Sequence, residues 1–259
     1  RIVLLDVLRG FAVLGILLMN ILAFGLPSPA YSYPGFDVDP AGGADRTAWI
    51  LVELFGEGSM RGLFSLLFGA GILLFTTGTG AKSATTHYRR MFFLLLFGLF
   101  DSYVLLWFGD ILICYALCGA LLYPLRHWRV RSLLLAALVI GVLTSLSYLA
   151  LNLGLQSLYE ASRVVAETAD PSALEPWVRD AAAGWNEFAA SYHLNAEQVA
   201  QEAQLRRDSY ASAFRWNLTQ SNTMLFFVTP LFLLWDALLM MLLGMALFRL
   251  GILAGGLSR

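Results

Sequence analysis

The stretch IVLLDVLRGFAVLGILLMNILAFGL, residues 2–26, decides the fold class because it is long and apolar enough to cross a bilayer. One crossing of the hydrocarbon core takes about 20 apolar residues. A secretory signal would have an apolar region of only about 7 to 15 residues and a small-residue cleavage site. We therefore interpret this stretch as the first membrane helix and expect a short leading segment before Arg1.

The composition of the chain is that of a membrane protein. Hydrophobic residues make up 58% and charged residues 14% of the 259 residues, and the mean hydropathy is +0.68. Soluble domains carry about 25% charged residues. The net charge of -1 and the lack of a basic patch in the sequence argue against a nucleic-acid partner. We expect the lipid bilayer to be the main solvent of this chain.

Five further stretches are long and apolar enough to follow the first one across the bilayer. The six stretches are residues 2–26, 49–77, 89–108, 109–125, 132–155 and 222–250. Almost no loop joins the third to the fourth, which predicts a tight helical hairpin. The predicted fold is all-α, a polytopic transmembrane helix bundle of about six helices, with an extracytoplasmic amphipathic helical segment between helices five and six.

The chain divides into three parts on this interpretation. Residues 1–155 form an N-terminal bundle of five helices, residues 156–221 an extracytoplasmic insertion, and residues 222–259 the sixth helix. We expect this last helix to begin a C-terminal membrane region that continues beyond Arg259.

Loop charges orient the helices. Positive residues gather in two loops, with Lys82, Arg89 and Arg90 in the first and Arg126, Arg129 and Arg131 in the second. Cytoplasmic loops carry such an excess of Lys and Arg. Residues 156–221 hold nine acidic residues and five arginines, and the loop after the first helix is also acidic. The pattern predicts a cytoplasmic N-terminus and extracytoplasmic acidic segments.

The acidic outer segment predicts two amphipathic helices. The first follows the N-cap Asp170 and has apolar residues at helical spacing. The second begins with a capping box formed by Asn195 and Gln198, and its apolar edge extends to Phe214. The two helices either cover the mouth of a membrane cavity or lie in the headgroup layer.

Four charged residues, Arg9, Arg61, Asp101 and Asp236, fall inside predicted membrane helices. A Lys, Arg or Asp at the centre of a membrane helix costs at least about 2.5 to 3.5 kcal/mol on insertion scales. Such residues face protein or water rather than lipid. They therefore predict a polar site inside the bundle without naming its substrate.

On the first helix a polar stripe should face the interior of the bundle. It consists of Asp6, Arg9, Val13, Ile16 or Leu17, and Asn20. A helix with 3.6 residues per turn brings these positions nearly into line. The alternative is an ion pair of Asp6 and Arg9 near the inner headgroups, where long side chains reach water at low cost.

On the second helix Glu57, Arg61 and Ser65 follow one another at four-residue steps. In a continuous helix Glu57 and Arg61 would form an ion pair. The run from Gly56 to Ser59 favours a break, which should line a cavity because hydrocarbon cannot satisfy free backbone groups. In both cases Arg61 points inward, either to bind a phosphate or carboxylate or to complete the ion pair.

Asp101 and Asp236 are expected deep in the membrane, and Arg9 and Arg61 are their candidate partners. A buried carboxylate without a cationic partner holds its proton more tightly and could act as an acid or base near neutral pH. A paired carboxylate would only compensate charge. Both interpretations stay open.

Trp107 and Asp110 lie at the tip of the predicted hairpin, where Asp110 could cap the fourth helix. The three histidines, His87, His127 and His193, form no evident metal pair in the sequence. We therefore expect them to be solvated, and we expect no metal centre.

Four blocks of sequence carry a family resemblance. They are LDVLRGFAVLGI at residues 5–16, continuing to Asn20-Ile21, RGLFSLLFGAG at 61–71, WFGDIL at 107–112 and MLLGMAL at 241–247. In this order they resemble the YeiB-like family of bacterial inner-membrane proteins, whose function is largely unassigned. The resemblance implies the bacterial inner membrane as the location. Because family members are longer, it also implies further helices after Arg259.

This family is in turn distantly similar to heparan-glucosaminide acetyltransferase-like transmembrane acyltransferases. They share an Asp-x-x-Arg-Gly opening, here Asp6 to Gly10, and move an acyl group across the bilayer from cytoplasmic acyl-coenzyme A. Those enzymes resemble one another in a histidine in the first external loop, which residues 27–48 lack. Many YeiB-like members have a histidine where this chain has Asp101, so Asp101 would act as the base in its place.

The similarity implies a transmembrane acyltransferase that moves an acyl group from cytoplasmic acyl-CoA to an extracytoplasmic or membrane acceptor. Arg9 and Arg61 would hold anionic groups, and Asp101 or Asp236 would remove a proton from the acceptor. The alternative is a small-molecule transporter or permease that uses the same charges as a substrate or proton relay.

Two observations would separate these functions. A cytoplasmic cavity lined by Arg61, Arg89 or Arg90 would favour acyl transfer, and an inverted repeat would favour transport. The substrate, which is either a small molecule or lipid-linked, and a homo-oligomeric state are left open by the sequence.

Overall fold

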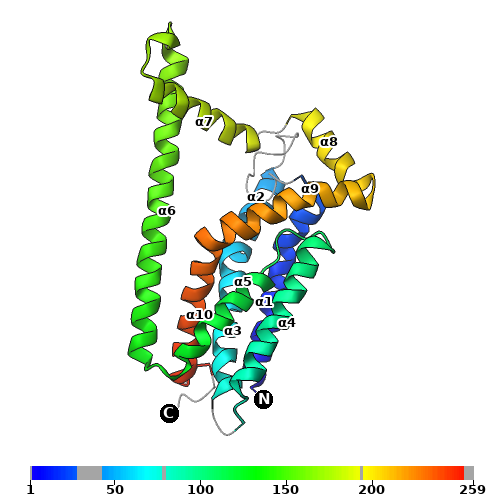
Figure 1. Ribbon diagram of the computed structural model, residues 1–259, viewed down its shortest axis with the longest axis vertical. Helices are drawn as coiled ribbons and strands as arrows, with labels where there is room; N and C mark the ends of the chain where they lie inside the picture. The colour runs from blue at the N-terminus through cyan, green and yellow to red at the C-terminus, as the bar shows by residue number, and fades with distance from the viewer. Residues whose placement is uncertain (1, 28–42, 78–79, 193–194, 254–259) are drawn as a thin grey trace.

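The computed structural model describes residues 2–27, 43–77, 80–192 and 195–253, and every regular element in these ranges is helical (Figure 1). In chain order the elements are α1 (Val3–Gly25), α2 (Gly43–Val52), η2 (Glu53–Glu57), α3 (Gly58–Thr76), α4 (Ala84–Tyr103), α5 (Leu112–Leu122), η3 (Tyr123–His127), α6 (Val130–Glu167), η4 (Pro171–Ala173), α7 (Pro176–Tyr192), α8 (Ala196–Arg207), α9 (Tyr210–Thr223), η5 (Met224–Leu233) and α10 (Leu234–Arg249). The predicted all-α helical bundle is confirmed.

The chain passes back and forth between two ends of the bundle. In Figure 1, α1, α4 and α6 run away from the end at which the described chain starts and finishes, and α3, α5 and α10 return to it. Four described stretches are long and apolar enough to cross a membrane: Val3–Gly25, Thr47–Thr76, Val130–Glu167 and Tyr210–Arg249. The count of six crossings and their orientation stay predictions. We name the starting end the inner end, after the predicted topology, and the opposite one the outer end.

An especially close helix crossing joins α3 to α10. A Cβ atom added to Gly69 would overlap the backbone of Met241, and one added to Gly244 would overlap the carbonyl oxygen of Leu66. Membrane helices gain packing energy from such backbone contact, which only small residues permit. Gly69 and Gly244 therefore permit the close packing of α3 against α10.

The core lies where α3, α5, α6 and α10 meet. Its fully buried side chains include Leu73 of α3, Cys118 of α5, Leu133 of α6 and Met241 of α10. Cys118 forms no disulfide, and its Sγ lies 3.7 Å from the carbonyl oxygen of Leu234. It fills space as a small apolar residue, which agrees with the ordinary behaviour of a buried thiol.

Two π-helical segments bend the chain. η2 joins α2 to α3 through the Gly56 region, so the predicted break is a widened helical turn. η5 contains Pro230, whose backbone nitrogen carries no hydrogen and so cannot donate the hydrogen bond of an α-helix. This segment lies between α9, which crosses the outer end of the bundle, and α10, which descends through it (Figure 1).

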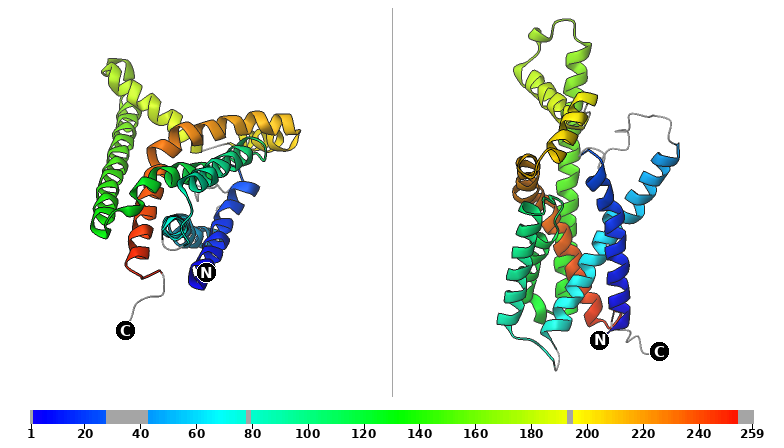
Figure 2. Two further views of the ribbon diagram at one scale, coloured as in Figure 1. Left: turned by 60° about the horizontal axis from the view of Figure 1, so that its bottom comes forward. Right: turned by 90° about the vertical axis from the view of Figure 1, so that its right-hand side faces the viewer.

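α6 is longer than its sequence pattern suggested. It has 38 residues and ends at Glu167, twelve residues after the predicted end of the fifth membrane stretch. At 1.5 Å per residue its length is about 57 Å, well beyond the thickness of the hydrocarbon core, which is about 30 Å. Its outer part projects past the bundle and contacts α7 (Figure 2), where Tyr159 packs against Trp185 at 5.1 Å between ring centroids.

The predicted hairpin with almost no loop is wrong. Ser83 caps α4 by accepting a hydrogen bond from the Thr86 backbone, so α4 begins five residues before the predicted membrane stretch. α4 ends at Tyr103, and residues 104–111 connect it to α5. Leu106 has a φ of 62° in this connection, a value that ends a helix and that non-glycine residues rarely adopt.

Of the two predicted outer helices, the second, α8, begins where the sequence indicates. Asn195 and Gln198 form both hydrogen bonds of the predicted capping box, each 2.9 Å long. The expected apolar edge through Phe214 is wrong, because α8 ends at Arg207 and Ser209 caps the separate helix α9. Asp170 caps the short η4 turn rather than α7, and its hydrogen bonds from Ser172 lower the pKa of its carboxyl group.

Candidate functional site

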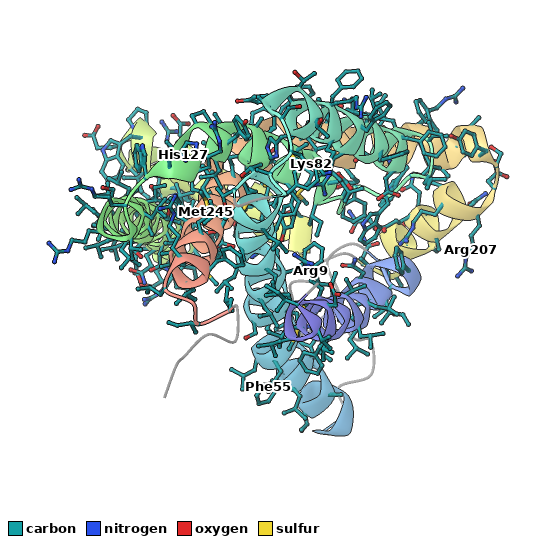
Figure 3. All side chains as sticks on the ribbon, turned by 90° about the horizontal axis from the view of Figure 1, so that it is seen from below. Arg9, Phe55, Lys82, His127, Arg207 and Met245 are labelled. Atoms are coloured by element: carbon teal, nitrogen blue, oxygen red, sulfur yellow. The ribbon has the colours of Figure 1, made fainter. Side chains whose placement is uncertain are left out.

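A cavity of about 340 Å³ opens near the inner end of the bundle, between α1, α3 and α4. Figure 3, seen from that end, shows Arg9 in the space that these helices bound. The side chains that give the cavity its chemistry are Arg9 of α1, Phe68 and Gly71 of α3, and His87, Arg90 and Met91 of α4. We name it the inner cavity.

Arg9 reaches the inner cavity from the second turn of α1. Its guanidinium lies 3.4 Å from the Asp6 carboxylate and 3.5 Å from the carbonyl oxygen of Leu67. A Cβ atom on Gly71 would stand 3.0 Å from the guanidinium, so the glycine leaves the room that Arg9 occupies. The expected pair of Asp6 and Arg9 is present, with both side chains partly buried.

His87 is the residue that the sequence interpretation placed wrongly. We expected a solvated loop residue, but the side chain is 1% exposed and lines the inner cavity. Its Nε2 lies 3.0 Å from the carbonyl oxygen of Gly119, and its ring stacks on Tyr123 at 4.7 Å. The correction follows from the cap at Ser83, which makes His87 part of α4 and turns it toward α5.

The hydrogen bond of His87 determines its chemistry. A carbonyl oxygen only accepts, so Nε2 carries the proton and the neutral ring keeps an unshared pair on Nδ1. Within the described part of the chain Nδ1 has no hydrogen-bond partner. His87 is therefore an imidazole of fixed orientation, and its second nitrogen is buried beside the inner cavity.

Arg90 follows His87 by one helical turn and brings a second cation to the inner cavity. Its guanidinium lies 4.0 Å from the centre of the Phe75 ring, a cation–π contact that holds it in place. Arg9 and Arg90 together make the inner cavity a positively charged space. Arg89 and Arg61, the other arginines considered for such a cavity, are not among its lining residues.

Arg61, Ser65 and Asp236 meet in a separate cluster between α3, α5 and α10. Arg61 Nη2 lies 3.4 Å from Asp236 Oδ2, which is one of the two pairings considered for these carboxylates. The hydroxyl oxygens of Ser65 and Tyr115 are 2.6 Å apart, and the carbonyl oxygen of Arg61 lies within hydrogen-bonding distance of both. This network ties three helices together.

The Arg61 and Asp236 pair yields a prediction for stability. Asp236→Leu alone should lower the free energy of unfolding by about 2 kcal/mol, because it leaves a positive charge inside the bundle. We expect less than for a fully buried pair because the side chains are 27% and 37% exposed.

The double variant Arg61→Met/Asp236→Leu should be closer to the native protein, since the guanidinium is removed together with the carboxylate it faces. Thermal unfolding in detergent measures both effects. A double variant less stable than Asp236→Leu would contradict a role in charge compensation.

Asp101 meets another carboxyl group rather than an arginine. The side chains of Asp101 and Asp110 are within hydrogen-bonding reach of each other. Two ionised carboxyl groups so close to each other would repel. Asp110 Oδ2 also accepts the backbone N–H of Ile113 at 2.9 Å and so caps α5, as expected.

Other predicted site residues lie elsewhere or are only partly placed. On α1 the buried face is formed by Leu5, Ala12, Met19 and Ala23, so the predicted stripe is wrong for Val13 and Leu17, which are exposed. Asn20 is half-buried, and Trp107 lies at the outer end. His127 is exposed, whereas the Glu57 side chain and His193 lie outside the described residues.

Sequence comparison finds known proteins that are similar to this chain. The chain is 39% identical over 127 residues to the uncharacterized protein YeiB of Escherichia coli (strain K12), a match that covers 48% of this chain and 31% of YeiB. It is 36% identical over 155 residues to the uncharacterized protein YxaH of Bacillus subtilis (strain 168), covering 58% of this chain and 38% of YxaH. The chain is thus similar in sequence to these YeiB-like proteins. No family model and no solved structure matches it.

The matches span about a third of the length of these YeiB-like relatives, so the activity of the whole protein is a matter for proposal. Among the described residues of this chain, no group of three His, Cys, Asp or Glu side chains could hold a metal ion. The inner cavity with Arg9, His87 and Arg90 is its candidate site.

Proposed function

We propose that the inner cavity binds the anionic part of a cytoplasmic acyl donor, with acyl-coenzyme A as the candidate, and that the protein transfers the acyl group to a membrane acceptor. The observation that carries this proposal is the meeting of two guanidinium groups and an oriented imidazole at one cavity. Arg9, Arg90 and His87 provide an anion site and a base side by side.

Charge favours an anion in this place. Guanidinium groups bind phosphate and carboxylate through paired hydrogen bonds, and their attraction grows in a site of low dielectric constant. Asp6 compensates part of the charge of Arg9. Arg90 faces the aromatic ring of Phe75 and keeps its N–H groups for an incoming anion.

Size limits what the inner cavity holds. Cavities for drug-sized ligands are about 300 to 1,000 Å³, and this one, at about 340 Å³, is at the lower limit. It accommodates one anionic group and the chain attached to it rather than a whole coenzyme. The remainder of the donor would extend from the inner end.

His87 supplies the proton chemistry. As the hydroxyl or amine of the acceptor bonds to the acyl carbon, this group loses a proton, and His87 would take it at Nδ1 once a shift on ligand binding exposes this buried nitrogen. The carbon–sulfur bond of the donor breaks, and the leaving thiolate takes up that proton. The hydrogen bond from Nε2 to Gly119 keeps the ring oriented for both transfers.

Proton-coupled transport of a small molecule is the second candidate, and the contact between Asp101 and Asp110 favours it. Two carboxyls that share a proton can release and rebind it when a substrate changes their surroundings. This function would use the outer half of the bundle and would not need a base beside Arg9 and Arg90.

Thermal unfolding of the purified full-length protein in detergent tests the proposal. An acyl-coenzyme A at 100 times its dissociation constant should stabilise the protein by about 2.7 kcal/mol. Arg9→Gln and Arg90→Gln should each weaken binding about tenfold, which removes about 1.4 kcal/mol of that effect. Arg89→Gln, which changes the same charge at an exposed neighbouring position, should bind like the native protein.

No saturable stabilisation by any acyl-coenzyme A in folded protein would overturn donor binding. Equal losses in Arg89→Gln and Arg90→Gln would show an unspecific charge effect and overturn the assignment to the inner cavity. In either case a flux measurement in liposomes, with Asp101→Asn as the variant, tests the transport function.

A further inference from the structure

A second cavity, of about 200 Å³, lies at the outer end, where α9 crosses near the ends of α1 and α4 (Figure 1). Side chains from three separate parts of the chain line it. They contribute Phe24 from α1, Trp107 and Phe108 from the α4–α5 connection, and Arg206, Trp216 and Asn217 from α8 and α9. We name it the outer cavity.

Aromatic rings form a continuous wall of the outer cavity. Ring centroids of Phe24 and Trp107 are 4.4 Å apart, those of Trp107 and Phe108 are 5.4 Å apart, and those of Phe108 and Trp216 are 6.0 Å apart. Aromatic side chains combine a large apolar face with little conformational freedom to lose on binding. Such a wall suits a ligand with a flat or gently puckered apolar face.

The side-chain oxygen of Asn217 is a buried acceptor that receives no hydrogen bond from the described residues. The side chain is 1% exposed, and its amide nitrogen donates to the carbonyl oxygen of Ser102 at 2.7 Å and to Ser221 Oγ at 2.9 Å. These bonds determine the orientation of the amide, because the opposite one would set two oxygens against each other. The oxygen Oδ1 has no partner among the described residues.

An unsatisfied buried acceptor costs about 1 to 3 kcal/mol, so the cavity favours a ligand that brings a hydroxyl or N–H donor to Asn217 Oδ1. This atom is the polar contact that would orient the ligand. The aromatic wall would supply the area of contact.

Arg206 makes a charged ligand a poor fit. Its Nη atoms donate to the carbonyl oxygens of Ala23, Phe24 and Leu26 at 2.8 to 3.2 Å and to Glu202 at 3.4 Å. Four of its five N–H groups are therefore engaged, which leaves little for an anion. Its positive charge, 5.0 Å from the centre of the Trp216 ring, repels a cation.

We propose that the outer cavity binds a neutral ring that carries hydroxyl groups, about the size of a single sugar unit. One hydroxyl donates to Asn217 Oδ1, and the ring face stacks on the wall formed by Trp107 and Trp216. The volume of about 200 Å³ is below the range for drug-sized ligands and suits one such ring. This proposal does not depend on acyl transfer at the inner cavity.

Saturation-transfer NMR on the full-length protein in lipid nanodiscs, free of glycoside detergents, tests the proposal. Methyl glucoside and myo-inositol serve as neutral probes, and glucosamine and glucose 6-phosphate as charged ones. The neutral probes should bind saturably and more tightly than either charged probe.

Two variants locate the binding. Asn217→Ala removes the acceptor, and Trp107→Leu removes part of the wall without touching Asn217, so the test survives if either variant fails to fold. Each should weaken the neutral probes about tenfold. The matched controls Asn152→Ala and Trp177→Leu lie at exposed positions of α6 and α7 and should bind like the native protein.

Three results would overturn the proposal. They are no saturable signal from either neutral probe in the native protein, tighter binding of a charged probe, and unchanged affinity in a folded Asn217→Ala or Trp107→Leu variant. None of them bears on the inner cavity, which is tested separately with acyl-coenzyme A.

Discussion

Gly244→Ala is expected to lower the free energy of unfolding by about 3 kcal/mol, at the upper end of the usual range for overpacking. The added methyl group would overlap the carbonyl oxygen of Leu66, a backbone atom that cannot turn aside as a flexible side chain would. α3 and α10 would have to separate, which weakens the core around Met241. For a chain of this size the melting temperature should fall by about 6 to 12 °C in detergent.

Gly154→Ala is the matched control. A Cβ atom at Gly154 of α6 meets nothing within 4 Å, and alanine favours a helix over glycine by about 1 kcal/mol. This variant should be as stable as the native protein or slightly more stable. If both substitutions had the same effect, the close crossing of α3 and α10 would not be the cause.

His87→Gln is expected to reduce acyl transfer by about 10² to 10⁴-fold, the usual contribution of a general base. The glutamine amide can still donate to the carbonyl oxygen of Gly119, but it has no basic nitrogen in place of Nδ1. Binding of the donor should persist because Arg9 and Arg90 are unchanged. Single-turnover rates, together with stabilisation by acyl-coenzyme A, measure the two effects separately.

His127→Gln serves as the control for this prediction, since His127 is exposed and is not among the lining residues of the inner cavity. Its rates should match those of the native protein. Unchanged transfer in His87→Gln with intact donor binding would remove His87 from the chemistry and leave the inner cavity as a binding site only.

Features that depend on neighbours along one helix could be predicted from the sequence. The capping box at Asn195, the cap at Asp110 and the pair of Asp6 and Arg9 each join residues three or four positions apart. Such contacts follow from the geometry of a single helix, whatever packs against it. The apolar stretches were equally clear, because each carries its own signal of length and hydropathy.

Features that join distant parts of the chain were less predictable. Asp236 had two candidate partners, and only the packing of α3 against α10 brings it to Arg61. For Asp101 the sequence left open whether it has a cationic partner, and the α4–α5 connection brings Asp110 to it. His87 was missed because Ser83, which caps α4, was taken for a loop residue. The three-residue spacing between His87 and Arg90 was a signal that both lie on one face of a helix.

The sequence by itself determined the class of this protein: a chain of apolar helices with a few charges inside them, since insertion into a bilayer depends on the composition of each segment alone. The tertiary structure decided which polar groups meet. The inner cavity joins α1, α3 and α4, and the outer cavity joins α1, α9 and the α4–α5 connection. The packing of helices against one another, with its close glycine contacts and π-helical segments, determines which polar groups lie together. This packing joins helices that are distant in sequence.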